Sequence, residues 1–182
     1  MNGKTLFAVF SMASFIVVAQ PATAQDTGVY VGAALGVAGA RQVCANTIGG
    51  CDDRESSLRL FGGYQLNRNL AVEGGYQYFG TFSQGSRGLF SNALDIVAVG
   101  SWPFTQELSA YGKVGAYVAR TSSAPASEDN IGLVYGLGAE WALSKEWSVR
   151  GEWQRYDNVG GGGLGFKTDI DVLSAAIVWR LR

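Results

Sequence analysis

The chain has 182 residues, of which 26 are glycine, 12% are aromatic and 16% are charged, with a net charge of −1. This balance and the lack of a basic stripe give no electrostatic basis for nucleic-acid binding. The sequence contains no histidine, which excludes histidine-dependent hydrolysis and weakens any metal-site interpretation.

Residues 1–24 have the pattern of a secretory signal peptide. Lys4 precedes an apolar stretch at 6–19, and Ala22-Thr23-Ala24 forms a small-residue cleavage site. A membrane-anchoring helix is the alternative, but the apolar stretch is shorter than the roughly 20 residues that cross a bilayer. We therefore expect export, with residues 25–182 forming a single domain.

Two cysteines, Cys44 and Cys51, flank a short polar loop rich in Asn, Gly and Asp. In an oxidising exported compartment, such a close pair favours a disulfide over a metal site. We predict a Cys44–Cys51 disulfide and no metal or other cofactor.

Beyond that loop, strand-like alternation accounts for most of the sequence. In the hairpin at 58–79 one side-chain set is mainly apolar, and the complementary set carries glycine, glutamine and charge. Successive strand residues point to opposite faces, so each strand has an apolar face and a mixed polar face. Most of these segments have about the 9–11 residues that a tilted strand needs to cross the hydrocarbon. We predict eight strands, near residues 28–39, 57–66, 69–79, 92–102, 108–119, 131–143, 147–156 and 170–181.

The connections between these strands alternate in length. Tight turns are expected at 67–68, 103–107 and 144–146, and long loops at 40–56, 80–91, 120–130 and 157–169. Short periplasmic turns opposite longer extracellular loops are typical of an outer-membrane barrel. The glycine-rich stretches at 80–91 and 160–165 favour mobile loops over a preformed pocket.

Lipid is the natural solvent for the apolar face, because glycine, glutamine and charge occupy the opposite face. Without a helical span beyond the signal, the exported chain can cross a membrane only as a closed barrel, since an open sheet edge leaves backbone groups unpaired in lipid. We predict an all-β fold, an eight-stranded antiparallel up-and-down transmembrane β-barrel. A soluble exported barrel that binds an apolar ligand in its centre is the alternative, and it requires the reverse facing.

Four tryptophans support this interpretation. Trp102, Trp141, Trp147 and Trp179 all fall at strand ends, beside the short turns or the C-terminus. Amphipathic rings collect at the level of the membrane interface, so we predict that these four form a periplasmic aromatic girdle. Aromatic residues of a soluble core are the alternative, but they need not gather at one set of strand ends.

The predicted inward face carries the strand charges. They are Arg59, Glu73, Asp95, Lys113, Glu140, Arg150, Glu152 and Arg180. Side chains fill so narrow a barrel, and an unpaired buried ion is costly, so these charges should pair. We predict a network of three acids and two bases, comprising Glu73, Glu140, Glu152, Lys113 and Arg150. A plug is the first interpretation, a salt-bridge gate for a small conductance the second, and acid–base catalysis by paired acids the last.

Glycine–aromatic and charged motifs recur along the predicted strands. They are Phe61-Gly62-Gly63-Tyr64-Gln65, Glu73, Gly75-Tyr76, Gly80, Tyr111-Gly112-Lys113-Val114-Gly115, Gly138-Ala139-Glu140-Trp141-Ala142, Arg150-Gly151-Glu152-Trp153-Gln154 and Trp179-Arg180-Leu181. In these motifs the chain resembles the transmembrane domain of the outer membrane protein A family, over nearly all of residues 25–182. The resemblance implies a location in a Gram-negative outer membrane.

The resemblance also implies roles for four charged residues. Glu73, Glu140 and Arg150 match interior members of the family's salt-bridge plug, and Lys113 matches a further interior basic position. The chain has Val99 where the family has another lysine, so the family's gating switch is not transferred.

The end of the sequence differs from the family pattern as well. Leu181 and Arg182 stand where such barrels usually close with an aromatic residue recognised by the assembly machinery. The peptidoglycan-binding domain that follows the barrel in longer relatives has no counterpart here, so we expect no cell-wall tethering.

Four functions remain to be compared. We favour a non-enzymatic structural and surface-interaction barrel, whose partners are outer-membrane lipid, the barrel assembly machinery during insertion, and an extracellular partner contacted through the loops. A narrow pore for ions or small solutes is the first alternative, followed by a lipid-acting barrel enzyme and the soluble ligand-binding barrel. We expect a monomer.

Overall fold

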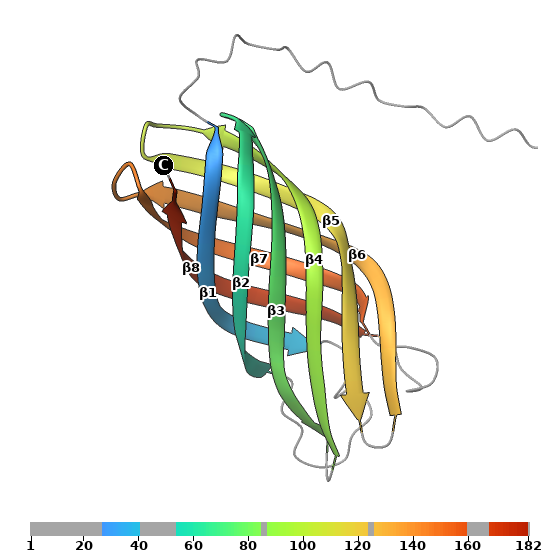
Figure 1. Cartoon of the computed structure of the whole chain (residues 1–182). Helices are drawn as coiled ribbons and strands as arrows, with labels where there is room; N and C mark the ends of the chain where they lie inside the picture. The colour runs from blue at the N-terminus through green and yellow to red at the C-terminus, as the bar shows by residue number, and fades with distance from the viewer. Residues whose placement is uncertain (1–26, 41–53, 85–86, 124–125, 160–167, 182) are drawn as a thin grey trace, which may run out of the picture.

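The described part of the chain forms a closed antiparallel barrel (Figure 1). The computed structural model describes residues 27–40, 54–84, 87–123, 126–159 and 168–181. Its strands are β1 (Gly28–Ala40), β2 (Arg54–Asn67), β3 (Leu70–Gln84), β4 (Arg87–Pro103), β5 (Leu108–Ser123), β6 (Ala126–Ala142), β7 (Trp147–Val159) and β8 (Thr168–Arg180).

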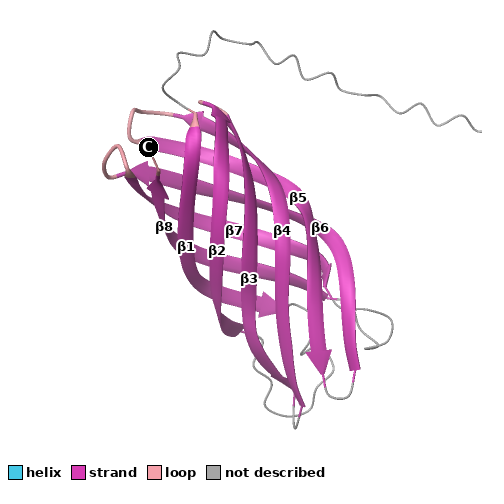
Figure 2. Ribbon diagram, viewed as in Figure 1, coloured by secondary structure: helices cyan, strands magenta, loops and turns pink. Residues whose placement is uncertain are grey.

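Each strand pairs with its neighbour in sequence, and β1 pairs with β8 to close the sheet. The predicted all-β, eight-stranded up-and-down barrel is confirmed (Figure 2). Closure leaves no open sheet edge, so each strand has a hydrogen-bonding partner on both sides. Within the described ranges, no helix has the length and apolarity needed to span a bilayer.

Three tight turns join the strands at one end of the barrel, which we call the short-turn end. β1 begins and β8 ends at this same end (Figure 1). The first turn is stabilised by Asn67, whose side-chain oxygen accepts hydrogen bonds from the backbone N–H groups of Asn69 (2.9 Å) and Leu70 (3.0 Å). Thr105 and Ser144 accept equivalent bonds in the other two turns, so each turn has its own side-chain acceptor.

At the opposite end, which we call the long-loop end, two of the predicted loops are wrong. The structure continues β3 to Gln84 and begins β4 at Arg87, within the loop predicted at 80–91. It also continues β5 to Ser123 and begins β6 at Ala126, within the loop predicted at 120–130. The backbone ladder persists through both extensions, although their sequences carry no regular period-two alternation of apolar and polar residues.

A bulge marks the point where the extension of β3 begins. The pairing of β3 with β4 shifts register between Tyr78 and Thr81, and Gly80 has a φ of 87°. A Cβ atom at Gly80 would lie 2.8 Å from Glu55 Cβ and 2.9 Å from Ser56 O, so both the backbone conformation and the space require glycine. Cys44, Cys51 and the 160–165 stretch lie outside the described residues.

The strands place their apolar set on the outside of the barrel. Leu35, Leu94 and Leu173 are exposed by 70%, 63% and 66%, whereas alternate residues such as Glu73 and Tyr30 are almost completely buried. This is the facing that a lipid-embedded barrel needs, and the described strands do not have the reverse facing of a soluble ligand-binding barrel.

A charge on the outer face should be costly only at membrane depth. Leu137, in the middle of the apolar part of β6, and Leu143, in the turn after β6, are similarly exposed (64% and 63%). We expect Leu137→Arg to lower the free energy of unfolding by about 2–4 kcal/mol and Leu143→Arg by about 1 kcal/mol or less. Equilibrium denaturant unfolding in phospholipid vesicles measures both. Equal losses for the two variants would contradict a lipid-facing exterior.

Candidate functional site

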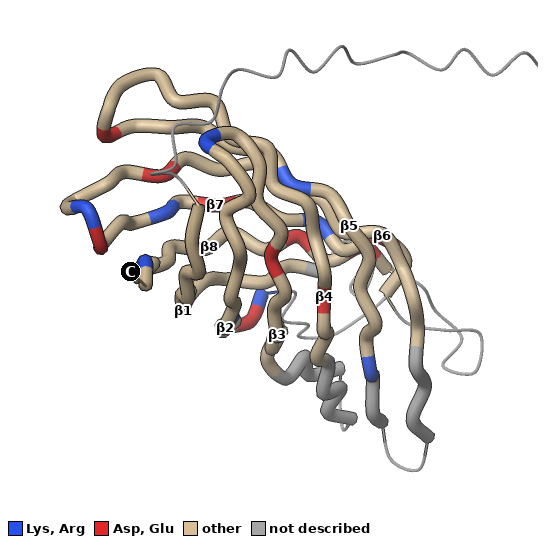
Figure 3. The backbone as a smooth tube through the Cα atoms, turned by 45° about the horizontal axis from the view of Figure 1, so that its top comes forward, with Lys and Arg blue, Asp and Glu red and all other residues tan. Residues whose placement is uncertain are grey.

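Strand β7 supplies a ladder of polar side chains that runs through the barrel interior. Its inward positions, at every second residue, are Ser148, Arg150, Glu152, Gln154 and Tyr156, and all five are buried. Because β7 starts at the short-turn end, these residues are stacked in order from that end toward the long-loop end. Charged residues lie along several strands as well as in the turns (Figure 3).

The layer nearest the short-turn end is centred on Arg150. Its Nη1 lies 2.5 Å from Glu73 Oε1, and its Nε lies 2.6 Å from Glu140 Oε2. The Tyr30 hydroxyl donates to the same Glu73 oxygen at 2.8 Å. One guanidinium therefore bridges carboxylates from β3 and β6, across the width of the lumen.

Glu140 is held from the short-turn side as well. The Ser148 hydroxyl donates to Glu140 Oε1 at 2.8 Å, and the Arg180 guanidinium forms an ion pair with the same oxygen. Glu140 therefore interacts with two arginines, of which only Arg180 is partly exposed. This pair links the buried layer to the end of the sheet at β8.

Aromatic rings surround the Arg150 guanidinium. Its central carbon lies 5.1 Å from the ring centroid of Tyr30, 5.5 Å from that of Phe61 and 5.2 Å from that of Tyr111. Such positions allow cation–π attraction, which strengthens where the cation is desolvated. Arg150 is thus held by two carboxylates and three rings.

The next layer contains Lys113 and Glu152. Lys113 Nζ lies 2.6 Å from Glu152 Oε1, and the Tyr111 hydroxyl donates to Glu152 Oε2 at 2.7 Å. Lys113 is on β5 and Glu152 on β7, so this pair joins two strands that are not neighbours in the sheet.

The layer nearest the long-loop end is built on Arg59. Its two terminal nitrogens contact both oxygens of Asp95, at 2.6 and 2.8 Å, in a bidentate pair. The Tyr156 hydroxyl donates to Asp95 Oδ2 at 2.9 Å. This layer is less completely paired, because Arg59 Nε and the side-chain oxygens of Ser57 and Gln77 have no partner among the described residues.

Gln154 connects this layer to the Lys113–Glu152 pair. With its amide nitrogen turned toward Glu152, it donates to Oε1 at 2.7 Å. In the same orientation its oxygen accepts from Arg59 at 3.0 Å and from Lys113 at 3.1 Å. A neutral amide therefore joins the two ion-paired layers.

Inward-facing glycines make room for the large side chains. A Cβ atom at Gly75 would lie 2.6 Å from Arg59 Nη2 and 3.1 Å from Asp95 Oδ1. At Gly132 it would lie 2.5 Å from the hydroxyl oxygen of Tyr117. Glycine on the inner face thus allows Arg and Tyr to lie flat across the neighbouring strand.

Eight inward-facing charges of the described strands form balanced pairs. Four acids (Glu73, Asp95, Glu140, Glu152) face four bases (Arg59, Lys113, Arg150, Arg180), and every one has an oppositely charged group within 4.0 Å. Desolvating ions is unfavourable unless such pairing compensates for it. Within the described ranges, no cluster of three or more His, Cys, Asp or Glu side chains could hold a metal ion.

The five residues of the predicted network lie in the lumen as two groups. Glu73 and Glu140 contact Arg150, whereas Glu152 contacts Lys113. Sequence reasoning placed the Arg59–Asp95 pair on the inner face but not in the network. It did not include Tyr30, Tyr111 or Tyr156 in the network, although their position in the strand alternation places them on the inner face, where their hydroxyls donate to the acids.

The four tryptophans of the predicted girdle are exposed on the outer face near the short-turn end. Trp102 and Trp141 are exposed by 65% and 58%. Trp147 and Trp179 are cross-strand partners and stack with ring centroids 5.8 Å apart and an interplanar angle of 12°.

Comparison with known proteins identifies the family to which this barrel belongs. The family model of the OmpA-like transmembrane domain matches residues 24–182. The chain belongs to this family. The OmpA-like barrel is 31% identical to outer membrane protein A of Klebsiella aerogenes in an alignment 193 residues long, which covers 97% of this chain and 55% of that protein. The chain thus spans about half the length of this curated relative.

Solved outer-membrane barrels share the fold. Neisserial surface protein A matches with a TM-score of 0.69 and 16% identity, covering 85% of this OmpA-like chain and 97% of the other. The N-terminal barrel of Pseudomonas aeruginosa OprF matches with a TM-score of 0.58 and 9% identity, covering 85% and 98%. Together with the family match, these neighbours indicate the outer membrane of a Gram-negative bacterium.

Neutralising one buried carboxylate tests the importance of the pairing. We expect Glu73→Gln to lower the free energy of unfolding by about 3 kcal/mol or more, because Arg150 loses a charged partner in the lumen. Denaturant unfolding in vesicles measures the change.

The matched control is Asp171→Asn. Asp171 accepts two hydrogen bonds from Arg155, but both side chains are about one-fifth exposed near the long-loop end. We expect a loss of about 1 kcal/mol or less there. Equal losses at the two sites would contradict a stabilising lumen network.

Proposed function

We propose that this OmpA-like chain is a structural and surface-interaction barrel whose lumen is plugged by its own side chains. The observation that carries the proposal is the pairing of eight lumen charges in three successive layers. The layer nearest the short-turn end is centred on Arg150, and the next layer on the Lys113–Glu152 pair. A third layer follows at Arg59 and Asp95. An ion entering from either end would have to displace charge-assisted bonds at each layer.

The same contacts argue for a role without catalysis. Glu73, Asp95, Glu140 and Glu152 are each engaged by a cation at short distance, which leaves them no open coordination for a substrate. General acid–base chemistry requires a group within hydrogen-bonding reach of the substrate proton. We therefore propose that these acids stabilise the barrel and do not transfer protons.

We also propose that residues 1–24 act as a cleaved export signal, which leaves the barrel of residues 25–182. Cys44 and Cys51 would form a disulfide in the exported chain. The barrel assembly machinery inserts the chain as a monomer. In such barrels the short turns face the periplasm, so an extracellular partner would meet the long-loop end.

Single-channel recording in planar bilayers tests the plug. We expect no steady conductance from the folded wild-type barrel, and brief openings from Arg150→Ala, because that change removes the group that spans the lumen between Glu73 and Glu140. Leu94→Ala on the outer face is the control and should remain closed. Folding of each variant is checked by its heat-dependent gel mobility.

The alternative of a narrow pore predicts a different pattern. Steady conductance from folded wild-type protein, unchanged by Arg150→Ala, would contradict the plug and support transport of ions or small solutes.

A further inference from the structure

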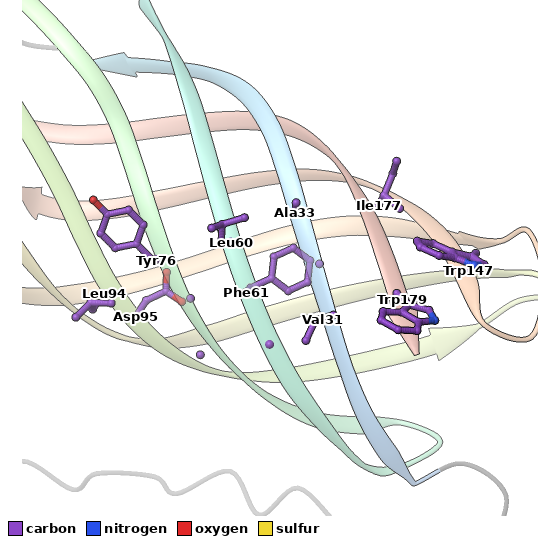
Figure 4. Close-up of a pocket in the computed structure, with 14 residues that line it drawn as sticks. Val31, Ala33, Leu60, Phe61, Tyr76, Leu94, Asp95, Trp147, Ile177 and Trp179 are labelled. Atoms are coloured by element: carbon purple, nitrogen blue, oxygen red, sulfur yellow. The ribbon is translucent and has the colours of Figure 1, made fainter. Parts of the chain in front are cut away.

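A shallow, open apolar groove of about 820 Å³ crosses the outer face of the barrel over β7, β8, β1, β2, β3 and β4. In Figure 4, Trp147 and Trp179 lie at one end of the groove, and Tyr76 and Leu94 lie at the other. Its open side is the outer face of the sheet, where the girdle tryptophans and exposed leucines lie.

The strand register shows that the groove follows two adjacent rows of cross-strand neighbours. The first row is Trp147, Trp179, Val31, Gly62 and Gly74. The second row is Ile177, Ala33, Leu60, Tyr76 and Leu94. Gly62, Gly74 and Ala33 form the low floor between the larger side chains of both rows.

The floor glycines are not required by packing within the barrel. A Cβ atom at Gly62 would approach no atom closer than 3.7 Å, and one at Gly74 none closer than 3.8 Å. This contrasts with the inward Gly75, where Arg59 leaves no space. Small residues on a membrane-facing surface allow a partner to approach the backbone closely, and association in lipid depends on such packing.

The groove runs from the level of the membrane–water interface toward the middle of the membrane. Trp147 is the first residue of β7 at the short-turn end, whereas Leu94 lies nine residues before the end of β4 at Pro103. Six strands from β7 to β4 span about 24 Å along the pairing direction. With strands tilted by about 40°, that path rises roughly 15 Å, which is half of a hydrocarbon core about 30 Å thick.

We propose that this groove holds one acyl chain of a phospholipid from the periplasmic leaflet. The chain would enter beside the stacked Trp147 and Trp179 rings, at the level where headgroups begin. It would then lie over Gly62 and Gly74 and end near Leu94. Lys145 and Glu146 precede Trp147, so the entrance carries both signs of charge and favours no headgroup. The site therefore selects the chain by packing and leaves the headgroup unselected.

Native mass spectrometry of the full barrel, extracted with a mild detergent from vesicles of phosphatidylethanolamine and phosphatidylglycerol, tests the proposal. We expect the wild-type barrel to retain one phospholipid of either headgroup. Filling the floor with Gly62→Leu/Gly74→Leu should lower the lipid-bound fraction about fivefold or more, because the packed contacts along the chain are displaced.

The matched control is Gly151→Leu. Gly151 is also an exposed glycine, and a Cβ atom there would meet no other atom within 4 Å, but it lies on β7 outside the groove. It should retain lipid as the wild type does. If the double variant does not show heat-dependent gel mobility, Ala33→Leu blocks the same floor from β1 with a single change.

Four results would overturn the proposal. One is a wild-type barrel that carries no lipid, and another is equal retention in the floor-filled and Gly151→Leu variants. The third is a dimer that disappears when the floor is filled, which would assign the groove to a second copy of the barrel. Retention of lipopolysaccharide in place of phospholipid, when both are supplied, would also contradict the assignment to the periplasmic leaflet.

Discussion

The pairing of ions in a narrow lumen is the constraint on which the rest of this structure depends. The outer face is surrounded by apolar solvent, so the charges of the strands must lie inside, where little water can hydrate them. Arg150 pairs with the carboxylates of Glu73 and Glu140 at once, at 2.5 and 2.6 Å, and the Tyr30 hydroxyl donates a further hydrogen bond to Glu73. The closed sheet fixes the positions of these groups, and the paired groups in turn join strands that are distant in the sheet.

Glycine has opposite uses on the two faces of this sheet. Inside, Gly75 has no side chain and so leaves room for the Arg59 guanidinium, and any side chain there would collide with the network. Outside, Gly62 and Gly74 have space for a larger residue and leave a groove in the apolar surface. The same residue type therefore serves dense packing in the lumen and an indentation on the membrane side.

Much of the fold could be predicted from the sequence because alternation in a membrane barrel is enforced by lipid. The facing of Leu94 against Asp95 follows directly from that rule, and the family match and the closed topology agree with it. The rule provides no signal where regular alternation stops. Near Gly80 and after Ala119 the sequence has no regular alternation of apolar and polar residues, so it resembled a loop where the strands continue.

The interior could be predicted only as a set of charged residues. Which acid meets which base depends on barrel tilt and stagger, properties of the whole sheet that no short segment carries. Lys113 therefore meets Glu152 across the lumen, although β6 separates their strands in the sheet. Arg59 and Asp95, from β2 and β4, likewise meet across the width of β3.

The most direct test of the account is a double-mutant cycle between Glu73 and Arg150, measured by unfolding in phospholipid vesicles. The cycle compares Glu73→Gln, Arg150→Met and the double variant, and so isolates the energy shared by the two residues. A buried pair at 2.5 Å should give a coupling energy of about 1.5 kcal/mol or more. Losses that add to within about 0.5 kcal/mol would show no coupling and contradict a lumen stabilised by paired ions.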